Sequence, residues 1–246
     1  MILLKLGGSV ITEKDTPETV DGEAIGRAAE AIATVDEPLV VVHGGGSFGH
    51  YQADRHGVSR EDGTRNAGAI RAIHGAMREL NTAVVNALDA AGAAPVPIAP
   101  FSAAVRTADG NLEMPTDHFD ALVRGDVLPV THGDVIADRR RGASILSGDE
   151  LIVHLARALE ADRVGLCSGV PGVLDADGSV ISEITALESV QAALGGSEST
   201  DVTGGMAGKV ETLLDLEAPA CVFGPTALPA FLGGDLPGTT IRSAGP

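Results

Sequence analysis

Short apolar runs alternate along the chain with segments of helical periodicity. Six runs predict β-strands, and they span residues 1–8, 38–46, 94–99, 126–134, 162–170 and 218–224. Several of them are continuous in Val, Ile and Leu instead of alternating with polar residues, which is typical of strands buried on both faces.

Between several of these runs, apolar residues recur every three or four positions, as on one face of an α-helix. Such stripes predict helices around residues 24–32, 70–88, 151–159 and 209–214. Residues 147–150 have the Ser-x-x-Glu spacing of a capping box, and residues 185–188 offer a similar start for a helix near 186–194. The polar, glycine-containing segments 105–117 and 195–201 predict loops or a hairpin.

Buried strands that alternate with helices predict an α/β protein, a three-layer αβα sandwich with a mostly parallel central sheet. In such sheets, ligands bind beyond the carboxyl ends of the strands. Glycine turns follow three of the predicted strands at those ends, at residues 7–8, at residues 44–46 and at Gly133. The sequence therefore predicts a ligand site at this edge of the sheet.

Composition narrows the range of partners. Hydrophobic residues make up 44% of the chain but aromatic residues only 2%, and the formal net charge is −17. This charge disfavours nucleic acid and anionic membranes as partners. An acidic, lysine-poor chain is typical of salt-loving cytoplasms, where the Debye length is only ~3 Å at 1 M salt. We find no 18-residue apolar run and no signal-peptide pattern, and Cys167 and Cys221 lie in apolar stretches, so we expect a cytoplasmic, halophilic protein with reduced thiols.

Lysine is almost absent from the chain, and its placement is therefore informative. The three lysines are Lys5, Lys14 and Lys209, against fourteen arginines. Lys5 and Lys14 lie on either side of a Gly-Gly-Ser turn, and Lys209 follows the glycines at 204–205. Because lysine is a compact point charge that binds phosphate oxygens, and bare glycine amides also bind anions, these positions predict a polyanion site. For any single Gly-Gly pair, a simple tight turn is an equally good explanation.

Two other phosphate-binding motifs fit less well. Residues 43–50, HGGGSFGH, match the dinucleotide-binding pattern G-x-G-x-x-G, but no apolar strand with a closing acidic residue follows about 20 positions later. Residues 203–210, TGGMAGKV, contain Gly-Lys, but Thr203 stands where a P-loop has its first glycine and Val210 where it needs Ser or Thr.

Four motifs in order resemble the amino acid kinase family over nearly the whole chain. They are KLGGSVIT at the N-terminus, HGGGSFGH at 43–50, SGDE at 147–150 and TGGMAGK at 203–209. The second motif ends in a histidine, and in this respect the chain resembles the branch of the family that phosphorylates isopentenyl phosphate. The resemblance implies transfer of the ATP γ-phosphoryl group to isopentenyl phosphate in isoprenoid biosynthesis. It also implies an acceptor lobe over residues 1–160, a nucleotide lobe over 161–246, and a homodimer.

The resemblance also implies roles for individual residues. Lys5 would contact the transferring phosphoryl group, Lys14 would stabilise the transition state, His50 would donate a hydrogen bond to the acceptor phosphate, and Asp149 would orient the lysines. The ATP-binding residues would be Lys5, Gly7, Gly8, Ser9, Gly45, Gly205 and Lys209. The acceptor-binding residues would be Gly44, Gly49, His50 and Gly148. Mg²⁺ would accompany ATP and be held mainly by phosphate oxygens and water, without a carboxylate cage.

Other residues have weaker or alternative interpretations. An apolar pocket for the prenyl tail could be lined by Ile73, Met77 and Leu80, although ordinary core positions explain them equally well. His43 favours a structural role, and Asp134 is a second candidate for the organising carboxylate.

One loop departs from the family pattern. Residues 168–172 read SGVPG where relatives commonly carry an acidic loop, and Asp175 or Asp177 are possible substitutes. The alternative functions are a same-fold kinase for fosfomycin, an acylated amino acid or a nucleoside monophosphate, and a non-catalytic ligand sensor on this fold.

Overall fold

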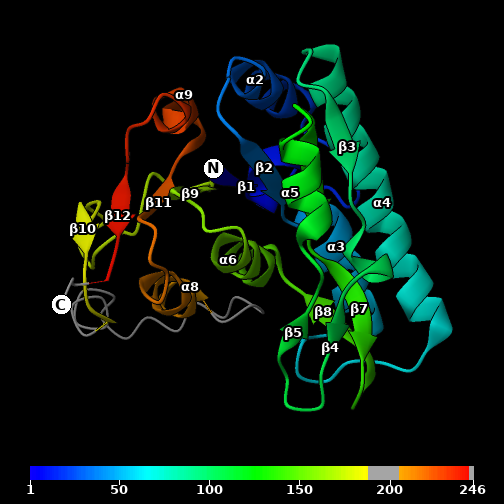
Figure 1. The fold of residues 1–246 in the computed structure, drawn as a ribbon. Coiled ribbons are helices and arrows are strands. Elements are labelled where there is room, and N and C mark those ends of the chain that lie inside the picture. The colour runs from blue at the N-terminus through cyan, green and yellow to red at the C-terminus, as the bar shows by residue number, and fades with distance from the viewer. Residues whose placement is uncertain (188–204, 244–246) are drawn as a thin grey trace.

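The computed structural model describes residues 1–187 and 205–243, and Figure 1 shows a large sheet between helices, with a smaller sheet at one end. The eight strands of the large sheet have the order β10-β12-β11-β9-β1-β2-β6-β3. Their bounds are β1 Ile2–Leu6, β2 Leu39–His43, β3 Pro95–Pro97, β6 Leu128–His132, β9 Arg163–Cys167, β10 Glu183–Ile184, β11 Ala220–Phe223 and β12 Thr239–Ile241. The six neighbouring strands β11, β9, β1, β2, β6 and β3 are parallel to one another, and β12 and β10 run in the opposite direction.

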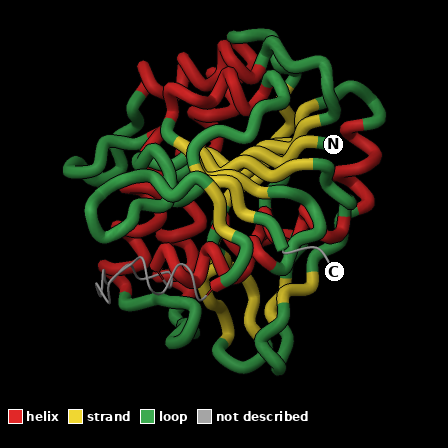
Figure 2. The backbone as a smooth tube through the Cα atoms, turned by 90° about the vertical axis from the view of Figure 1, so that its left-hand side faces the viewer, coloured by secondary structure: helices red, strands yellow, loops and turns green. Residues whose placement is uncertain are grey.

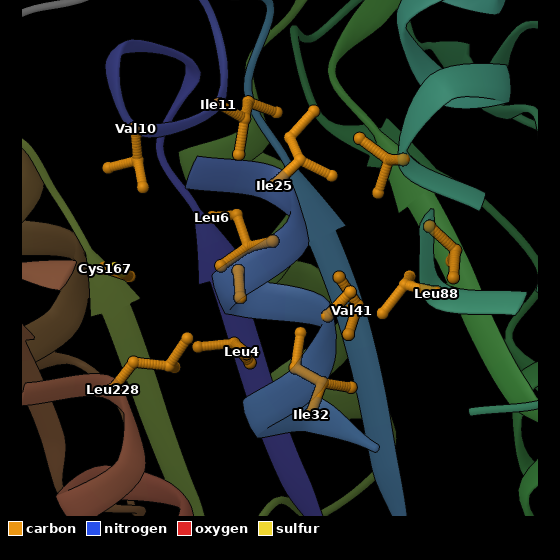
Figure 3. Close-up of a cluster of buried hydrophobic side chains, with 14 of the residues drawn as sticks. Leu4, Leu6, Val10, Ile11, Ile25, Ile32, Val41, Leu88, Cys167 and Leu228 are labelled. Atoms are coloured by element: carbon orange, nitrogen blue, oxygen red, sulfur yellow. The ribbon is translucent and has the colours of Figure 1, made fainter. Parts of the chain in front are cut away.

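The side chains of β1 alternate between two hydrophobic cores. Leu4 and Leu6 point to a core beneath α2, where Figure 3 shows them with Ile25 and Ile32. Leu3 points to the core on the opposite face, which α5, α6 and α8 cover. The strand is therefore buried on both faces, which explains why all of its residues except Lys5 are apolar.

Helices lie on both faces of the sheet, as Figure 2 also shows in a view turned by 90°. The helices of the first core are α1 Gly8–Ile11, α2 Gly22–Ile32, α3 Gly46–His56, α4 Ala67–Ala90 and α9 Leu228–Leu232. The helices of the second core are α5 Asp117–Val123, α6 Gly148–Ala158 and α8 Gly205–Leu214. The three-layer α/β architecture predicted from the sequence is confirmed.

A second sheet of four strands, in the order β5-β4-β7-β8, lies beside α3 and α4 at one end of the molecule (Figure 1). Its strands are β4 Val105–Arg106, β5 Leu112–Glu113, β7 Asp134–Asp138 and β8 Gly142–Leu146. The antiparallel pairing of β4 with β5 confirms the hairpin expected within 105–117, whereas the sequence did not predict β7 and β8.

The six predicted strands all form, and the four helices predicted from apolar stripes appear as α2, α4, α6 and α8. The sequence did not predict α3, because the buried face of this helix contains only Phe48, Gly49 and Gln52. Most of the helix expected at 186–194, and the loop expected at 195–201, lie outside the described residues. Among residues 1–187 and 205–243, no helix is long and apolar enough to cross a membrane.

Candidate functional site

The carboxyl ends of four central strands meet at one edge of the large sheet. Leu6 of β1 is in register with His43 of β2 and with Cys167 of β9, and His43 is in register with His132 of β6. The glycine turns that follow β1, β2 and β6 therefore lie side by side at this edge of the sheet. The predicted convergence of the glycine motifs at one edge is confirmed for the turns that the structure describes.

Two of these turns touch backbone to backbone. A Cβ atom added to Gly8 would lie 2.1 Å from the amide nitrogen of Gly46, and one added to Gly44 would lie 2.8 Å from the nitrogen of Gly8. Gly46 itself has a φ of +48°, and Thr12 Oγ1 would be 2.3 Å from its added Cβ. Glycine is required here because no side chain fits between the turns. The contact brings the start of α1 next to the start of α3.

Asp149 joins two of the three lysines. Lys5 follows the alternation of β1 onto the α6 side of the sheet, and its Nζ donates to Asp149 Oδ1 at 2.5 Å. Lys209, on α8, has its Nζ 3.8 Å from Asp149 Oδ2. Burial alone would raise the pKa of Asp149, but the ammonium groups of Lys5 and Lys209 hold this pKa below its ordinary value. The carboxylate therefore stays charged and keeps two cations at the ligand edge.

The first turn of α6 holds Asp149 in place. Ser147 caps the helix by accepting a hydrogen bond from the amide of Glu150 at 3.1 Å, as the capping-box spacing predicted. The Glu150 carboxylate, however, binds Arg106 of β4, with Nη1–Oε1 and Nη2–Oε2 distances of 2.6 and 2.9 Å. Arg106 is 1% exposed and also donates to Ser144 Oγ. This pair fastens the small sheet to the helix that carries Asp149, and no sequence pattern had indicated it.

Replacing Arg106 with methionine should lower the free energy of unfolding by about 3 kcal/mol, because it leaves the Glu150 carboxylate without its main partner. Urea unfolding measures this change. The exposed Arg124, paired with Asp120 one helical turn away, is a matched control, and Arg124→Met should cost about 0.5 kcal/mol or less. Equal losses in the two variants would contradict this assignment.

His50 lies on α3, which begins at the glycine turn of residues 44–46, and its side chain is exposed. A Cβ atom added to Gly45 would lie 3.2 Å from His50 Cδ2 and 3.5 Å from Met77 Sδ of α4. The same sulfur would be 2.6 Å from a Cβ added to Gly49, so Gly49 allows α3 and α4 to pack closely. The apolar side chains of α4 therefore begin directly beside His50.

The three residues predicted to line a tail pocket all lie in the core. Ile73 and Met77 are 1% exposed and Leu80 is 0% exposed. Ile73 belongs to a small cluster with Val135, whereas Met77 and Leu80 belong to the large core beneath α2 and α4. Met77 contacts the segment that carries His50, and Ala53 of the same helix packs against the cluster of Ile73, so the pocket itself stays a prediction.

Two histidines are buried together at the ends of β2 and β6. The rings of His43 and His132 stack with centroids 5.2 Å apart, and His43 Nε2 is 3.1 Å from Asn81 Oδ1 of α4. Burial lowers the pKa of His43, and burial together with the neighbouring His43 lowers the pKa of His132 from 6.5 to about 3. Both rings are therefore neutral near pH 7, which supports the structural role expected of His43.

The neutral His132 makes the protein sensitive to acid. Because the unfolded chain binds this proton near pH 6.5 and the folded chain only near pH 3, stability falls as the pH drops through this interval. Between pH 7 and pH 4.5, the wild type should lose about 2 kcal/mol more than His132→Asn. Urea unfolding at both pH values measures the difference, and parallel losses would contradict the buried neutral state.

Asp134 lies away from the lysine cluster. It is 2% exposed and accepts a hydrogen bond from His74 Nδ1 at 2.8 Å and one from the Val135 amide at 2.8 Å. Burial raises its pKa, and the hydrogen bond from His74 opposes this rise. Asp134 therefore joins α4 to the start of β7, and Asp149 alone of the two candidates contacts lysines.

Lys14 is not part of the cluster around Asp149. It is exposed on the loop of residues 13–19, which lies next to the start of α3. Of the late glycine motif, Gly205 begins α8 and Gly204 lies outside the described residues.

The SGVPG loop reaches the same edge, since a Cβ on Gly169 would be 3.2 Å from Ser9 Oγ. Asp175 accepts hydrogen bonds from the amides of Asp177 and Ser179, so its carboxylate stabilises its own turn. Among residues 1–187 and 205–243, no group of three His, Cys, Asp or Glu side chains could hold a metal ion.

The glycine turns, the helix starts and the paired lysines lie at the ligand edge of an α/β sheet, where a protein that transfers phosphate needs them. The strand–turn–helix order at 39–56 also fits a dinucleotide site, but the next strand, β3, follows only after two helices. The arrangement therefore defines the class of phosphate-binding α/β enzymes.

Comparison with known proteins places the chain within this class. The family model described as "Amino acid kinase family" matches residues 1–218 of the chain. The chain is 57% identical over 244 residues to the isopentenyl phosphate kinase of Haloferax volcanii, with 98% of each chain covered. It is 37% identical to that of Methanothermobacter thermautotrophicus, covering 87% of this chain and 86% of the relative. A solved structure described as "X-ray structures of isopentenyl phosphate kinase" has a TM-score of 0.78 at 28% identity, covering 98% of this chain and 99% of that chain. The chain therefore belongs to the amino acid kinase family and, within it, to the isopentenyl phosphate kinases.

Proposed function

We propose that the chain transfers the γ-phosphoryl group of ATP to isopentenyl phosphate and forms isopentenyl diphosphate for isoprenoid biosynthesis. The observation that carries the proposal is the pairing of Lys5 and Lys209 with the single carboxylate of Asp149 at the ligand edge. Transfer of a phosphoryl group requires positioning and neutralisation of charge on its oxygens. Two cations oriented by one anion meet both requirements.

Residue roles follow from position. Lys5 and Lys209 contact the phosphates of ATP, and Asp149 orients both ammonium groups. The exposed His50, beside the glycine turn at 44–46, donates a hydrogen bond to the acceptor phosphate. No general base is needed because the attacking oxygen already belongs to a phosphate. Lys14 completes the charge neutralisation from its own loop.

The amides of Gly7, Gly44 and Gly49 already donate to the carbonyls of Cys167, Leu6 and Gly45, so these three glycines let the backbone approach the phosphates closely without donating to them. ATP is bound by Lys5, Gly7, Gly8, Ser9, Gly45, Gly205 and Lys209, and the acceptor by Gly44, Gly49, His50 and Gly148. Gly148 suits this role because a Cβ there would lie 3.2 Å from Lys5 Cε, so the start of α6 directly adjoins the lysine. The prenyl tail extends from His50 toward Met77.

Mg²⁺ would accompany ATP and would supply positive charge to the phosphate oxygens. Both oxygens of Asp149 already face lysines, which leaves this carboxylate poorly placed as a metal ligand. Phosphate oxygens and water would hold such an ion.

The same proposal includes an acceptor lobe over residues 1–160, a nucleotide lobe over 161–246, a cytoplasmic location and a homodimer. A boundary at residue 160 would lie between α6 and β9 and so would divide no helix or strand. Gel filtration in high salt tests the dimer.

The alternatives are a kinase with another acceptor and a non-catalytic sensor. Coupled ADP release measured in high salt with isopentenyl phosphate, acetylglutamate, UMP and fosfomycin separates them. We expect turnover with isopentenyl phosphate to exceed turnover with the other acceptors by at least about a hundredfold. Preference for another acceptor would overturn the proposed substrate, and absence of turnover with all four would favour a sensor.

A further inference from the structure

The loop that carries Lys14 is closed at its base. Thr12 and Val20 form an antiparallel bridge, and the amide of Glu13 donates to the carbonyl of Thr19 at 2.9 Å. Lys14 therefore lies on a defined hairpin-like loop between α1 and α2, which we call the Lys14 loop (residues 13–19).

The returning arm of the Lys14 loop is fastened to α3. The amide of Glu18 donates to the carbonyl of Ser47 at 3.0 Å, and Gln52 Nε2 donates to Glu18 Oε1 at 2.7 Å. Ser47 also donates its amide to Thr12 Oγ1 at 3.0 Å. The base of the loop at Thr12 and its returning arm at Glu18 are thus both bound to the first two turns of α3.

Two features set the contact between Gln52 and Glu18 apart from an ordinary surface hydrogen bond. Gln52 is only 8% exposed, and no residue in the described part of the chain donates a hydrogen bond to its Oε1, so half of this buried amide has no protein partner there. Glu18 has a φ of +50°, a conformation that costs free energy for a residue other than glycine. An unmet buried amide oxygen and a strained backbone both cost free energy, and such features concentrate at functional sites.

The helix that holds the loop also carries His50. Residues two positions apart on an α-helix are separated by about 200° around its axis, so His50 and Gln52 face different sides of α3. One side of α3 thus faces the acceptor and the other fixes the Lys14 loop. The carboxylate of Glu18 is engaged by Gln52, and no ion pair among residues 1–187 and 205–243 involves Lys14.

We propose that Gln52 is a positioning residue for Lys14: by binding Glu18, it fixes the Lys14 loop so that the ammonium group can reach the transferring phosphoryl group. This inference rests on the proposed role of Lys14 and adds to it the pair that makes the role possible. Gln52 itself does not touch the substrates.

Kinetics test this coupling. Gln52→Met keeps the side-chain volume but removes the donor, and it should lower kcat about tenfold because a misplaced catalytic group loses most of its effect. Glu18→Met should match this loss, whereas Glu18→Gln retains an acceptor oxygen and should stay within about twofold of the wild type. In a Lys14→Met background, Gln52→Met should change kcat by less than about twofold, since nothing remains to be positioned.

Lysine-specific proteolysis tests the same contact without activity. A protease that cleaves only after lysine can cut this chain only after Lys5, Lys14 and Lys209. Cleavage after Lys14 should be at least about fivefold faster in Gln52→Met than in the wild type, because cleavage follows local opening. Cleavage after Lys209 is the internal control and should not change.

The outcomes are distinct. An equal kcat loss from Gln52→Met with and without Lys14, an unchanged kcat in Gln52→Met, or unchanged cleavage after Lys14 would each overturn the inference. If Lys14→Met keeps the wild-type kcat, the proposed role of Lys14 is overturned and the inference falls with it. Absence of turnover in the wild type would overturn the proposed function, and the cleavage rates would still decide whether Gln52 holds the loop.

Discussion

Asp149→Asn is expected to lower kcat about a thousandfold, because the oriented charge that stabilises the transition state depends on this carboxylate. Asparagine keeps the shape of the side chain but not its charge. Lys5 and Lys209 both lie within 4 Å of that carboxylate, so without it they repel each other and lose their fixed positions. Steady-state kinetics with ATP and isopentenyl phosphate measure the loss.

Asp120→Asn is the matched control, since Asp120 is a partly exposed helix residue paired with Arg124. It should leave kcat unchanged. Unfolding gives a second readout of Asp149. Because the pKa of Asp149 is lowered in the folded state, its ion pairs stabilise the protein above pH 3.8 and lose this effect as the pH falls below that value. An Asp149→Asn enzyme with wild-type kcat would contradict the proposed role.

His50→Ala is expected to lower kcat/KM for isopentenyl phosphate about a hundredfold while leaving KM for ATP unchanged, because a hydrogen bond to a charged group contributes about 1.5–3 kcal/mol. His50→Gln keeps an N–H donor and should recover part of the loss. The exposed position beside the glycine turn makes a change in stability small, so the effect can be assigned to binding and transfer.

His56, an exposed histidine in the last turn of the same helix, provides the control. His56→Ala should behave as the wild type in both KM values and in kcat. If His50→Ala raised KM for ATP and left kcat/KM for isopentenyl phosphate unchanged, His50 would bind the nucleotide instead of the acceptor, and the proposed role would be contradicted.

Much of the fold is predictable from local pattern. The largely apolar sequences of β1 (ILLKL) and β2 (LVVVH) indicate strands buried on both faces, and the long stripe of α4 indicates an amphipathic helix. By contrast, α3 has a buried face that includes Gly49 and Gln52, so its apolar period is too weak to detect. The short strands β12 and β10 depend on the pairing of β12 with β11 and of β10 with β12, which no local pattern shows.

The site is only partly predictable for a related reason. The scarcity of lysine singles out Lys5 and Lys209, but their meeting at Asp149 joins residues 144 and 60 positions apart, counted as 149 − 5 and 209 − 149. The family resemblance, not the spacing, indicated that partner. The contacts of Arg106 with Glu150 and of Gln52 with Glu18 link polar residues in segments without any motif, so only the structure reveals them.

The most direct test is a crystal structure with a non-hydrolysable ATP analogue and isopentenyl phosphate bound together. The account predicts that the Nζ atoms of Lys5 and Lys209 lie about 3 Å from nucleotide phosphate oxygens and that His50 lies about 3 Å from an acceptor oxygen, as charge-assisted hydrogen bonds require. A nucleotide bound away from Asp149, or an acceptor phosphate out of reach of His50, would contradict it.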